Sequence, residues 1–272
     1  MLWKNPRSSI ELPAEAAAAY EAMVELAPLD HYVEKQGRST GRYALRSSGG
    51  SETFFLKRYF RLPWWRRWLA PLGSFPGPQE MAHLRLAGEL GIPVPEVLAA
   101  GAERAHRCQS FLAVRELVGF LPLHEFIPRR LAEAATDLPS HRRALTRRIA
   151  TLARVLHGAR LYHRDLYLCH FFIRPAADAP DGFELEMIDF LRLKRSRLAR
   201  WRLKDLAQLL FSADIAGITR ADRLRFFKHY LGTEKFSAAD RRLLKQVERK
   251  ANRYRRHNAK MEAGQTRRTK CE

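Results

Sequence analysis

Four residues in this 272-residue chain have types and surroundings suited to moving a phosphoryl group. Lys57 lies in the apolar run TFFLKRYF, which is typical of a strand, and Glu80 begins a predicted helix. Asp165 follows a strongly amphipathic helix, and Asp189 ends the predicted strand FELEMIDF. Phosphoryl transfer needs a cation on the nucleotide, a carboxylate that steadies the cation, an acceptor for a hydroxyl proton and an acid that binds a metal ion.

Each of these residues also has an ordinary structural explanation. Lys57 could be a solvated lysine at a strand end, and Glu80 a first-turn glutamate that the helix dipole favours. The H-R-D tripeptide that ends at Asp165 can arise by chance, and an aspartate such as Asp189 is common in turns. Their order along the chain favours the chemical interpretation, because one fold explains them more simply than four separate coincidences.

Two regions of different composition must position these side chains. Short β-prone runs with glycine turns fill the amino half and predict antiparallel hairpins. Helical periodicity with interspersed arginines dominates the carboxyl half. We therefore expect an α+β fold with two lobes, a small β-rich one and a larger helical one. The expected divisions are a helical lead-in over 1–30, an N-lobe over 31–117, a C-lobe over 118–258 and a basic, disordered tail over 259–272.

Composition narrows the setting. The formal net charge of +20 favours acidic partners such as nucleic acid, an anionic membrane surface or a phosphorylated substrate. Cys108, Cys169 and Cys271 lie far apart without metal-ligand spacing, which favours a reducing compartment. The amino terminus lacks the apolar core of a signal peptide, and no apolar run reaches the roughly 18 residues of a membrane span. We expect a cytoplasmic protein.

The stretch HRDLYLCHFFI, followed by MIDFLRLKR, resembles the lipopolysaccharide kinase family of Gram-negative bacteria, in particular the inner-core heptose kinases. That family has the protein-kinase fold, and its catalytic loop carries histidine where protein kinases carry asparagine. The resemblance runs from about residue 31 to 231, and the loop is its specific part. His170 is then the family's residue rather than a decayed asparagine.

The resemblance implies an ATP- and Mg²⁺-dependent kinase with a protein-kinase-like fold. It implies that Lys57, paired with Glu80, binds the nucleotide phosphates and that Asp165 accepts the sugar hydroxyl proton. His163 of the same motif is counted with the catalytic residues, and Asp189 is expected to bind Mg²⁺.

Two features leave alternatives open. His170 could ligate the metal or be a structural histidine bonded to backbone, since Mg²⁺ prefers oxygen ligands. The loop KQGRSTGRYAL lacks the pattern G-x-G-x-x-G, so side chains and backbone amides would cover the phosphates in its place. The residues expected to contact ATP, besides Lys57 and Glu80, are Gly37, Arg38, Ser39, Gly41, Glu116 and Val118.

The segment after Asp189 bears on the substrate. Only fifteen residues separate Asp189 from Asp205, too few for a peptide-holding platform. Arginine and lysine clusters suit phosphates and sugar-acid carboxylates, so we expect a lipopolysaccharide core glycolipid as substrate. A solvated basic face is the alternative interpretation. The basic residues are Arg192, Lys194, Arg195, Arg197, Arg200, Arg202 and Lys204.

The tryptophan-rich run RLPWWRRWLAPLG predicts peripheral contact with the cytoplasmic face of the inner membrane, with packing on the small lobe as the alternative. No zinc spacing, RNP-type motif or helix-turn-helix signal is present, so we expect no nucleic-acid partner. No obligate protein partner is evident. The competing hypotheses are a kinase-fold phosphotransferase for another small hydroxyl acceptor and a non-catalytic basic binding protein.

Overall fold

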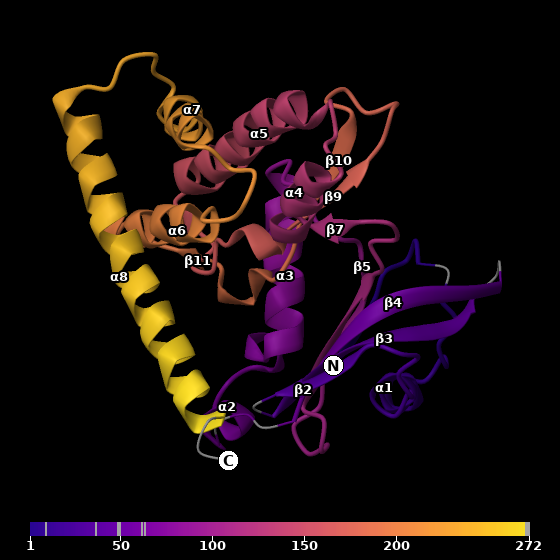
Figure 1. Cartoon of the computed structure of the whole chain (residues 1–272). Helices are drawn as coiled ribbons and strands as arrows, with labels where there is room; N and C mark the ends of the chain where they lie inside the picture. Colours follow the sequence, from indigo (N-terminus) through magenta and orange to yellow (C-terminus); the bar gives the residue numbers. More distant parts are fainter. Residues whose placement is uncertain (9, 36, 48–49, 61, 63, 270–272) are drawn as a thin grey trace. The chain divides into compact units, whose positions relative to one another are not determined.

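The computed structural model describes residues 1–272 except 9, 36, 48–49, 61, 63 and 270–272. The chain divides into two compact units, which are described separately. The first consists of Met1–Val118 with Asp189–Leu191, and the second of Gly119–Ile188 with Arg192–Glu272. Figure 1 follows the chain through both units.

The first unit is built on an antiparallel sheet with the strand order β1-β5-β6-β4-β3-β2. Its strands are β1 (Leu2–Lys4), β2 (Tyr32–Lys35), β3 (Arg38–Ser47), β4 (Gly50–Tyr59), β5 (Val97–Ala102) and β6 (Ser110–Arg115). Its helical elements are α1 (Ala16–Val24), α2 (Trp64–Trp68), the 3₁₀ turn η1 (Leu72–Ser74) and α3 (Pro76–Glu89).

The two faces of this sheet have different partners. Side chains alternate between the faces of a strand, so Lys57 and Arg58 of β4 point to opposite sides. On the Arg58 side, Tyr20 and Met23 of α1 pack into the apolar core. On the other side α3 starts very close to β6, because a Cβ on Gly77 would lie 2.1 Å from the Phe111 carbonyl oxygen. The glycine therefore allows α3 to bring Glu80 to the sheet.

The second unit is mainly helical. Its strands are β7 (Leu121–Pro122), β8 (Leu161–Tyr162), β9 (Phe171–Pro175), β10 (Phe183–Met187) and β11 (Lys194–Arg195), and they form the ladders β10-β9-β7 and β11-β8. Its helical elements are α4 (Leu123–Ala132), α5 (Leu138–Gly158), η2 (Leu168–His170), α6 (Ala199–Ser212), α7 (Arg220–Leu231) and α8 (Ala238–Thr269). A further 3₁₀ turn, η3 (Phe190–Arg192), lies where the chain passes from the first unit to the second.

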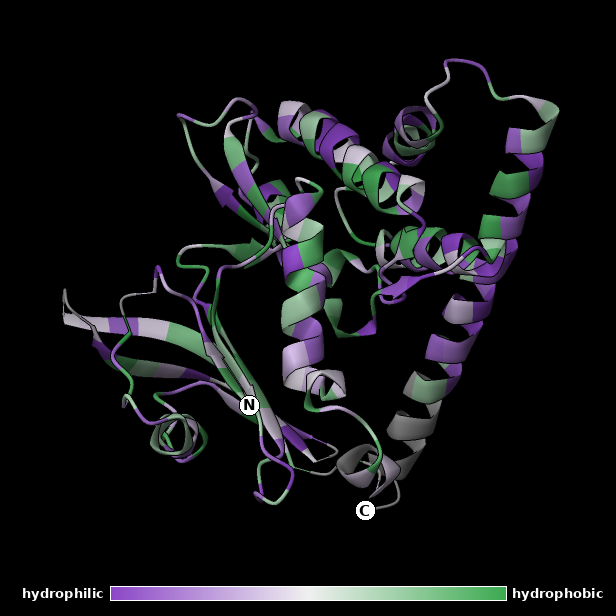
Figure 2. Ribbon diagram, turned by 180° about the vertical axis from the view of Figure 1, so that it is seen from behind, coloured by the Kyte–Doolittle hydropathy of each residue, from purple (hydrophilic) through white to green (hydrophobic). Residues whose placement is uncertain are grey.

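Helix α5 packs on α7, and α6 packs on α8. The leucine and isoleucine positions that the sequence places on one side of α5 are buried, among them Leu145, Ile149 and Leu156. Helix α8 is different, because hydrophilic residues cover most of its length (Figure 2) and only Val247 and Ala251 are buried within its described part.

The two chain ends differ from the expectation. The segment 1–30 is more than a helical lead-in, because β1 completes the sheet beside β5 and Ile10 is fully buried. The expected disordered tail over 259–272 is instead helical as far as Thr269. Its Ala, Glu, Lys, Met and Arg residues are good helix formers, and this propensity outweighs the polarity that suggested fraying. In the described part of the chain no helix is both long and apolar enough to cross a membrane.

Candidate functional site

Lys57 is the centre of a charged cluster in the first unit. Its Nζ lies 2.6 Å from Glu80 Oε1 and 3.3 Å from Asp189 Oδ1. The Glu80 side chain is only 1% exposed, so its carboxylate has no solvent to stabilise its charge. Tyr59, on the same face of β4, donates from Oη to the second Glu80 oxygen at 3.3 Å. Lys57, Glu80 and Asp189, which sequence order alone linked, are therefore in direct contact.

The segment Asp189–Leu191 is held against α3 by a backbone contact. His83 Nδ1 lies 2.9 Å from the Phe190 carbonyl oxygen, and Phe190 is fully buried. Asp189 has a φ of 64°, in the left-handed region that few non-glycine residues adopt. Such a conformation persists only where the surroundings impose it, and it aims the Asp189 carboxylate at Lys57.

The electrostatics keep Lys57 charged. Burial lowers the pKa of Lys57, but the carboxylates of Glu80 and Asp189 outweigh burial, so the pKa is raised above its ordinary value. Burial, reinforced by the Glu80 carboxylate, raises the pKa of Tyr59 well above its ordinary value. The cluster therefore presents a fixed cation and a tyrosine that remains a hydrogen-bond donor at neutral pH.

The residues expected around the nucleotide phosphates lie on both faces of the sheet. Thr40 pairs with Lys57 across the β3–β4 ladder, so Arg38 and Thr40 share the Lys57 face. Ser39 pairs with Arg58 and is fully buried on the opposite face. The Ser39 side chain is thus directed away from Lys57, and the expected contact of Ser39 with ATP stays a prediction.

The two glycines of this region have structural functions. Gly37, at the β2–β3 turn, has a φ of 74°, and its carbonyl accepts a hydrogen bond from Phe60 N at 2.8 Å. A Cβ on Gly41 would lie 2.8 Å from the His31 carbonyl oxygen, on the face opposite Lys57. Gly41 therefore allows close packing of the backbone, and its expected contact with ATP stays a prediction.

Glu116 and Val118, also expected to contact ATP, follow the end of β6. Glu116 Oε1 accepts a hydrogen bond from Arg42 Nε at 2.8 Å, so this side chain is engaged within the first unit. Val118 is 63% exposed. The contacts of both residues with ATP stay predictions.

In the second unit Asp165 is surrounded by cations. Arg192 Nη1 lies 3.0 Å from Asp165 Oδ2, and Lys204 Nζ lies 3.6 Å from Oδ1. Gln208 Nε2 donates to the same Oδ1 at 3.5 Å. Burial lowers the pKa of Lys204, and the positive charge of Arg192 acts in the same direction, whereas Asp165 opposes them. Two residues of the basic segment thus fix the carboxylate that the sequence predicts as the base.

Asp205 organises the backbone of the loop that carries Asp165. Its fully buried carboxylate accepts hydrogen bonds from the backbone N–H of His163 at 2.9 Å and of Arg164 at 2.8 Å. Arg164 has a φ of 68°, so a non-glycine residue is again held in the left-handed region. Hydrogen bonds to a charged, buried acceptor are strong enough to maintain such a conformation.

The histidines of the loop have different environments. His163 is fully buried and its Nε2 lies 3.2 Å from the Ile188 carbonyl oxygen, a contact that positions the loop. Its expected catalytic role stays a prediction. His170 Nδ1 donates to the Asp165 carbonyl oxygen at 2.7 Å. A carbonyl only accepts, so in neutral His170 the proton is on Nδ1 and Nε2 is the atom able to bind a metal. The backbone bond therefore suits both of the alternatives for His170.

Comparison with known proteins identifies the family. Residues 24–230 match the model of the lipopolysaccharide kinase (Kdo/WaaP) family. The chain belongs to this family. It is 31% identical over 229 residues to the lipopolysaccharide core heptose(I) kinase WaaP of Pseudomonas aeruginosa, covering 80% of each chain. It is 35% identical over 153 residues to the WaaP of Escherichia coli, covering 54% of this chain and 56% of that protein.

A solved structure described as WaaP in complex with acyl carrier protein has the same fold, with a TM-score of 0.63 and 30% identity over 86% of this chain and 91% of that one. The expected kinase-like fold is confirmed, as are membership of the lipopolysaccharide kinase family and the identity of the protein as an ATP-dependent phosphotransferase. The complex also bears on the expectation that no obligate protein partner exists, because a relative was solved with one.

The basic residues between Arg192 and Lys204 fall into two groups, those with contacts inside the protein and those that are exposed. Arg202 Nε donates to Tyr230 Oη at 2.8 Å, and Arg200 lies over the Trp201 ring at 4.7 Å, so these two residues have structural contacts. Together with Arg192 and Lys204 at Asp165, they leave Lys194, Arg195 and Arg197 as the exposed remainder.

Sequence reasoning missed the supporting residues on α6. Asp205, Gln208 and Ser212 all contact the loop, since Gln208 Oε1 accepts from Leu166 N at 3.3 Å and Ser212 Oγ accepts from Leu168 N at 2.9 Å. A signal existed. These polar residues recur at intervals of three and four in the otherwise apolar stretch KDLAQLLFS, which places them on one side of the helix.

Proposed function

We propose that the protein transfers the γ-phosphate of ATP to a heptose hydroxyl of the lipopolysaccharide inner core. The contact of Lys57 with Glu80 and Asp189 is the observation that carries this proposal, because it joins the cation and the acid that a triphosphate requires. The names of the relatives supply the acceptor, since both are heptose(I) kinases of the lipopolysaccharide core.

In the first unit, Lys57 binds the phosphates and Glu80 holds it in place. The shorter contact, 2.6 Å to Glu80, persists when nucleotide binds, whereas the longer contact, 3.3 Å to Asp189, is exchanged for a phosphate oxygen. The buried Glu80 has no other cation among the described ion pairs of the first unit, so its attachment to Lys57 is the stable one. Arg38, exposed on the same face, lies beside the turn expected to cover the phosphates.

Mg²⁺, when bound, neutralises charge that develops on the transferred phosphoryl group. Asp189 offers the carboxylate oxygens that this ion prefers, and its side chain is 32% exposed, so it is accessible. His170 Nε2 is the second candidate ligand, and its donation through Nδ1 sets the required tautomer.

In the second unit, Asp165 accepts the proton of the attacking sugar hydroxyl. Its side chain is 17% exposed, so one side is open while Arg192, Lys204 and Gln208 hold the other. Arg192 and Lys204 keep the Asp165 carboxylate oriented, and they can also bind phosphate oxygens as the sugar approaches. The exposed Lys194, Arg195 and Arg197 bind phosphate and sugar-acid groups of the glycolipid.

An acceptor panel tests this function. Purified protein with radiolabelled ATP and Mg²⁺ is given core glycolipid lacking the heptose phosphate, the same glycolipid lacking heptose, free heptose and unrelated small alcohols. Label is expected only in the heptose-bearing glycolipid. Transfer only to a free small acceptor would favour the other phosphotransferase hypothesis. No transfer to any acceptor, with salt-sensitive DNA binding, would favour a non-catalytic basic protein.

Peripheral membrane contact is part of the proposal, with the residues of α2 as the contact site. Trp64, Trp68 and Leu69 are 71%, 67% and 74% exposed, an unusual concentration of large apolar side chains at a surface. Indole rings favour the headgroup region of a bilayer, and the strong positive charge of the chain favours anionic lipid. Arg61 and Pro63 of the predicted run lie outside the described residues.

Cosedimentation with phosphatidylglycerol vesicles tests the contact. Replacing Trp64, Trp68 and Leu69 by alanine should reduce the bound fraction several-fold, while alanine at Leu29, which is 53% exposed in the same unit, should not. Equal binding by both variants would assign the attraction to net charge alone.

We also infer that this protein binds acyl carrier protein, as the structural relative does. The candidate site for its acyl chain is an apolar cavity of the second unit, lined by side chains such as Leu145, Ile149, Leu206 and Phe227. Its volume is only about 70 Å³, so it must widen to accept an acyl chain. Acyl-loaded carrier protein should raise the melting temperature more than the unloaded form. Ala213→Phe, inside the cavity, should remove that difference and the exposed Ala199→Phe should not. A difference retained in Ala213→Phe would exclude the cavity.

A further inference from the structure

Besides the apolar cavity of the second unit, the protein has a cavity in the first unit, on the face of the sheet that carries α1. It has a volume of about 610 Å³, within the range of ~300–1,000 Å³ usual for ligand pockets. Arg58, Tyr32, Lys35 and Gly37 are among the residues that line it. Since Arg58 and Lys57 are neighbours in β4, this cavity lies on the side of the sheet opposite the Lys57 cluster.

Arg58 is a buried cation without a carboxylate. It is 7% exposed, and within the described residues no acid lies at ion-pair distance from it. Its Nη2 donates to the carbonyl oxygens of Met23 at 3.0 Å and Leu26 at 2.5 Å, at the carboxyl end of α1. Its guanidinium lies 4.7 Å from the centre of the Tyr43 ring. These contacts fix the side chain and offset part of its charge, but Nε has no hydrogen-bond partner in the described structure.

A further buried polar atom beside Arg58 lacks a partner within the described residues. Tyr43, over which Arg58 stacks, is fully buried, and its Oη makes no hydrogen bond there. Ser39, the cross-strand neighbour of Arg58, has Tyr32 as a side-chain hydrogen-bond partner. Leaving a buried donor such as Arg58 Nε unsatisfied costs about 1–3 kcal/mol, so this arrangement calls for a polar occupant.

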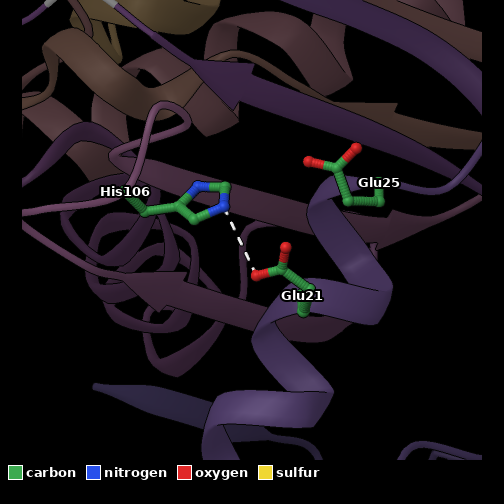
Figure 3. A group of neighbouring side chains, drawn as sticks. All are labelled: Glu21, Glu25 and His106. Atoms are coloured by element: carbon green, nitrogen blue, oxygen red, sulfur yellow. Dashed lines mark ion pairs between the residues drawn. The ribbon is translucent and has the colours of Figure 1, made fainter.

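The charges that line the cavity favour an anion. Lys35, Arg58 and Arg107 contribute three positive charges, and Glu25 and Glu34 two negative ones. Glu34 accepts a hydrogen bond from Tyr32 Oη at 2.9 Å, which removes part of its repulsion. The ligand-capable atom of Glu25 lies within 4.8 Å of those of Glu21 and His106 (Figure 3), so this carboxylate is associated with that group.

The Glu21, Glu25 and His106 group in Figure 3 does not itself require a ligand. His106 Nε2 lies 3.4 Å from Glu21 Oε2, an ion pair that accounts for the arrangement when the imidazole is charged, and both glutamates are exposed. Arg58, by contrast, is held inside the protein with an unused donor.

We propose that this cavity binds a small oxyanion of the phosphate class, with Arg58 as its main ligand. Arg58 Nε is the unpartnered donor among the residues that line the cavity, and Lys35 and Arg107 of the same lining supply further positive charge. The site is separate from the Lys57 face and does not depend on the kinase function proposed above.

Calorimetric titration of the full chain with inorganic phosphate, at constant ionic strength, tests the site. One saturable site with a Kd near or below about 1 mM is expected. Arg58→Lys, which keeps the charge but loses Nε, should weaken binding about tenfold or more. Arg46→Ala, which removes an exposed charge of β3 elsewhere, should leave affinity unchanged.

The variant Lys57→Met tests which face of the sheet binds phosphate. Phosphate binding should survive this change, and crystals grown with selenate should show an anomalous peak within hydrogen-bonding distance of Arg58. Melting temperatures within a few degrees of the parent protein confirm that each variant is folded. Binding that is lost in Lys57→Met and retained in Arg58→Lys would place the anion at the triphosphate face and overturn the proposal. Heat that varies only with ionic strength would overturn it as well.

Discussion

Replacing Asp205 by asparagine should disturb the loop that carries Asp165. The two carboxylate oxygens accept the backbone N–H groups of His163 and Arg164 at 2.9 and 2.8 Å inside a fully buried site. Asparagine retains one acceptor oxygen and turns an amide NH₂ toward the other donor. One charge-assisted bond, of about 1.5–3 kcal/mol, is lost, and the other weakens to a neutral one.

The expected loss of stability is therefore about 2–4 kcal/mol, which lowers the melting temperature by roughly 5–15 °C in a domain of this size. Because Arg164 is held in the left-handed region by these bonds, part of this free energy appears as a misplaced Asp165. A misplacement worth about 1.4–3 kcal/mol reduces kcat roughly 10- to 100-fold. The KM for ATP should change little, because the Lys57 cluster belongs to the first unit.

Thermal denaturation followed by tryptophan fluorescence, and transfer rates measured well below the melting temperature of the variant, check both parts. Asp181→Asn is the matched control, since its contact with Arg147 at 3.3 Å is an exposed ion pair that contributes about 0–1 kcal/mol. Wild-type stability and wild-type kcat in Asp205→Asn would refute the assignment of Asp205 as the residue that shapes the loop.

Three further changes have defined outcomes. Glu80→Gln removes the main partner that raises the pKa of Lys57, so burial then lowers that pKa. When the Kd for ATP is measured from pH 7 to 10, affinity should therefore fall at a lower pH in this variant than in the parent protein. Asp189→Asn should abolish the Mg²⁺ dependence of nucleotide binding, and an unchanged Mg²⁺ titration would remove Asp189 from the metal role. Burial raises the pKa of Glu186 to about 7, with Glu184 adding to the shift, so the folded state loses stability as pH rises from about 4.5 through 7, and Glu186→Gln should raise the melting temperature at pH 8 but not at pH 4.

The sequence identified the reacting groups better than their supports. Lys57, Glu80 and Asp189 were predictable because each stands at a recognisable point of a strand or helix, and the loop around Asp165 has a specific pattern. The spacing of Asp205 and Gln208 places them on one side of a helix, but the sequence does not show that this helix, which begins 34 residues after Asp165, packs beside the loop.

Strand register places the residues predicted to bind the nucleotide on two different faces of the sheet. Arg38 and Ser39 are adjacent in sequence, but the alternation of side chains in β3 sends Ser39 to the buried face with Arg58. The loop sequence does not determine which of its side chains lie on the Lys57 face. A change of one residue in the pairing of β3 with β4 would move every side chain of β3 to the other face of the sheet. His163 shows a related limit, since burial decides whether a motif histidine reaches a substrate.

The central claim is the proposed division of roles, in which Asp165 accepts the hydroxyl proton and Lys57 binds the nucleotide phosphates. Single-turnover transfer from radiolabelled ATP to heptose-bearing core glycolipid by Asp165→Ala, with ATP binding measured on the same sample, tests it most directly. The account predicts that transfer falls by several orders of magnitude while the Kd for ATP stays within about threefold. Transfer at the wild-type rate in this variant would contradict it.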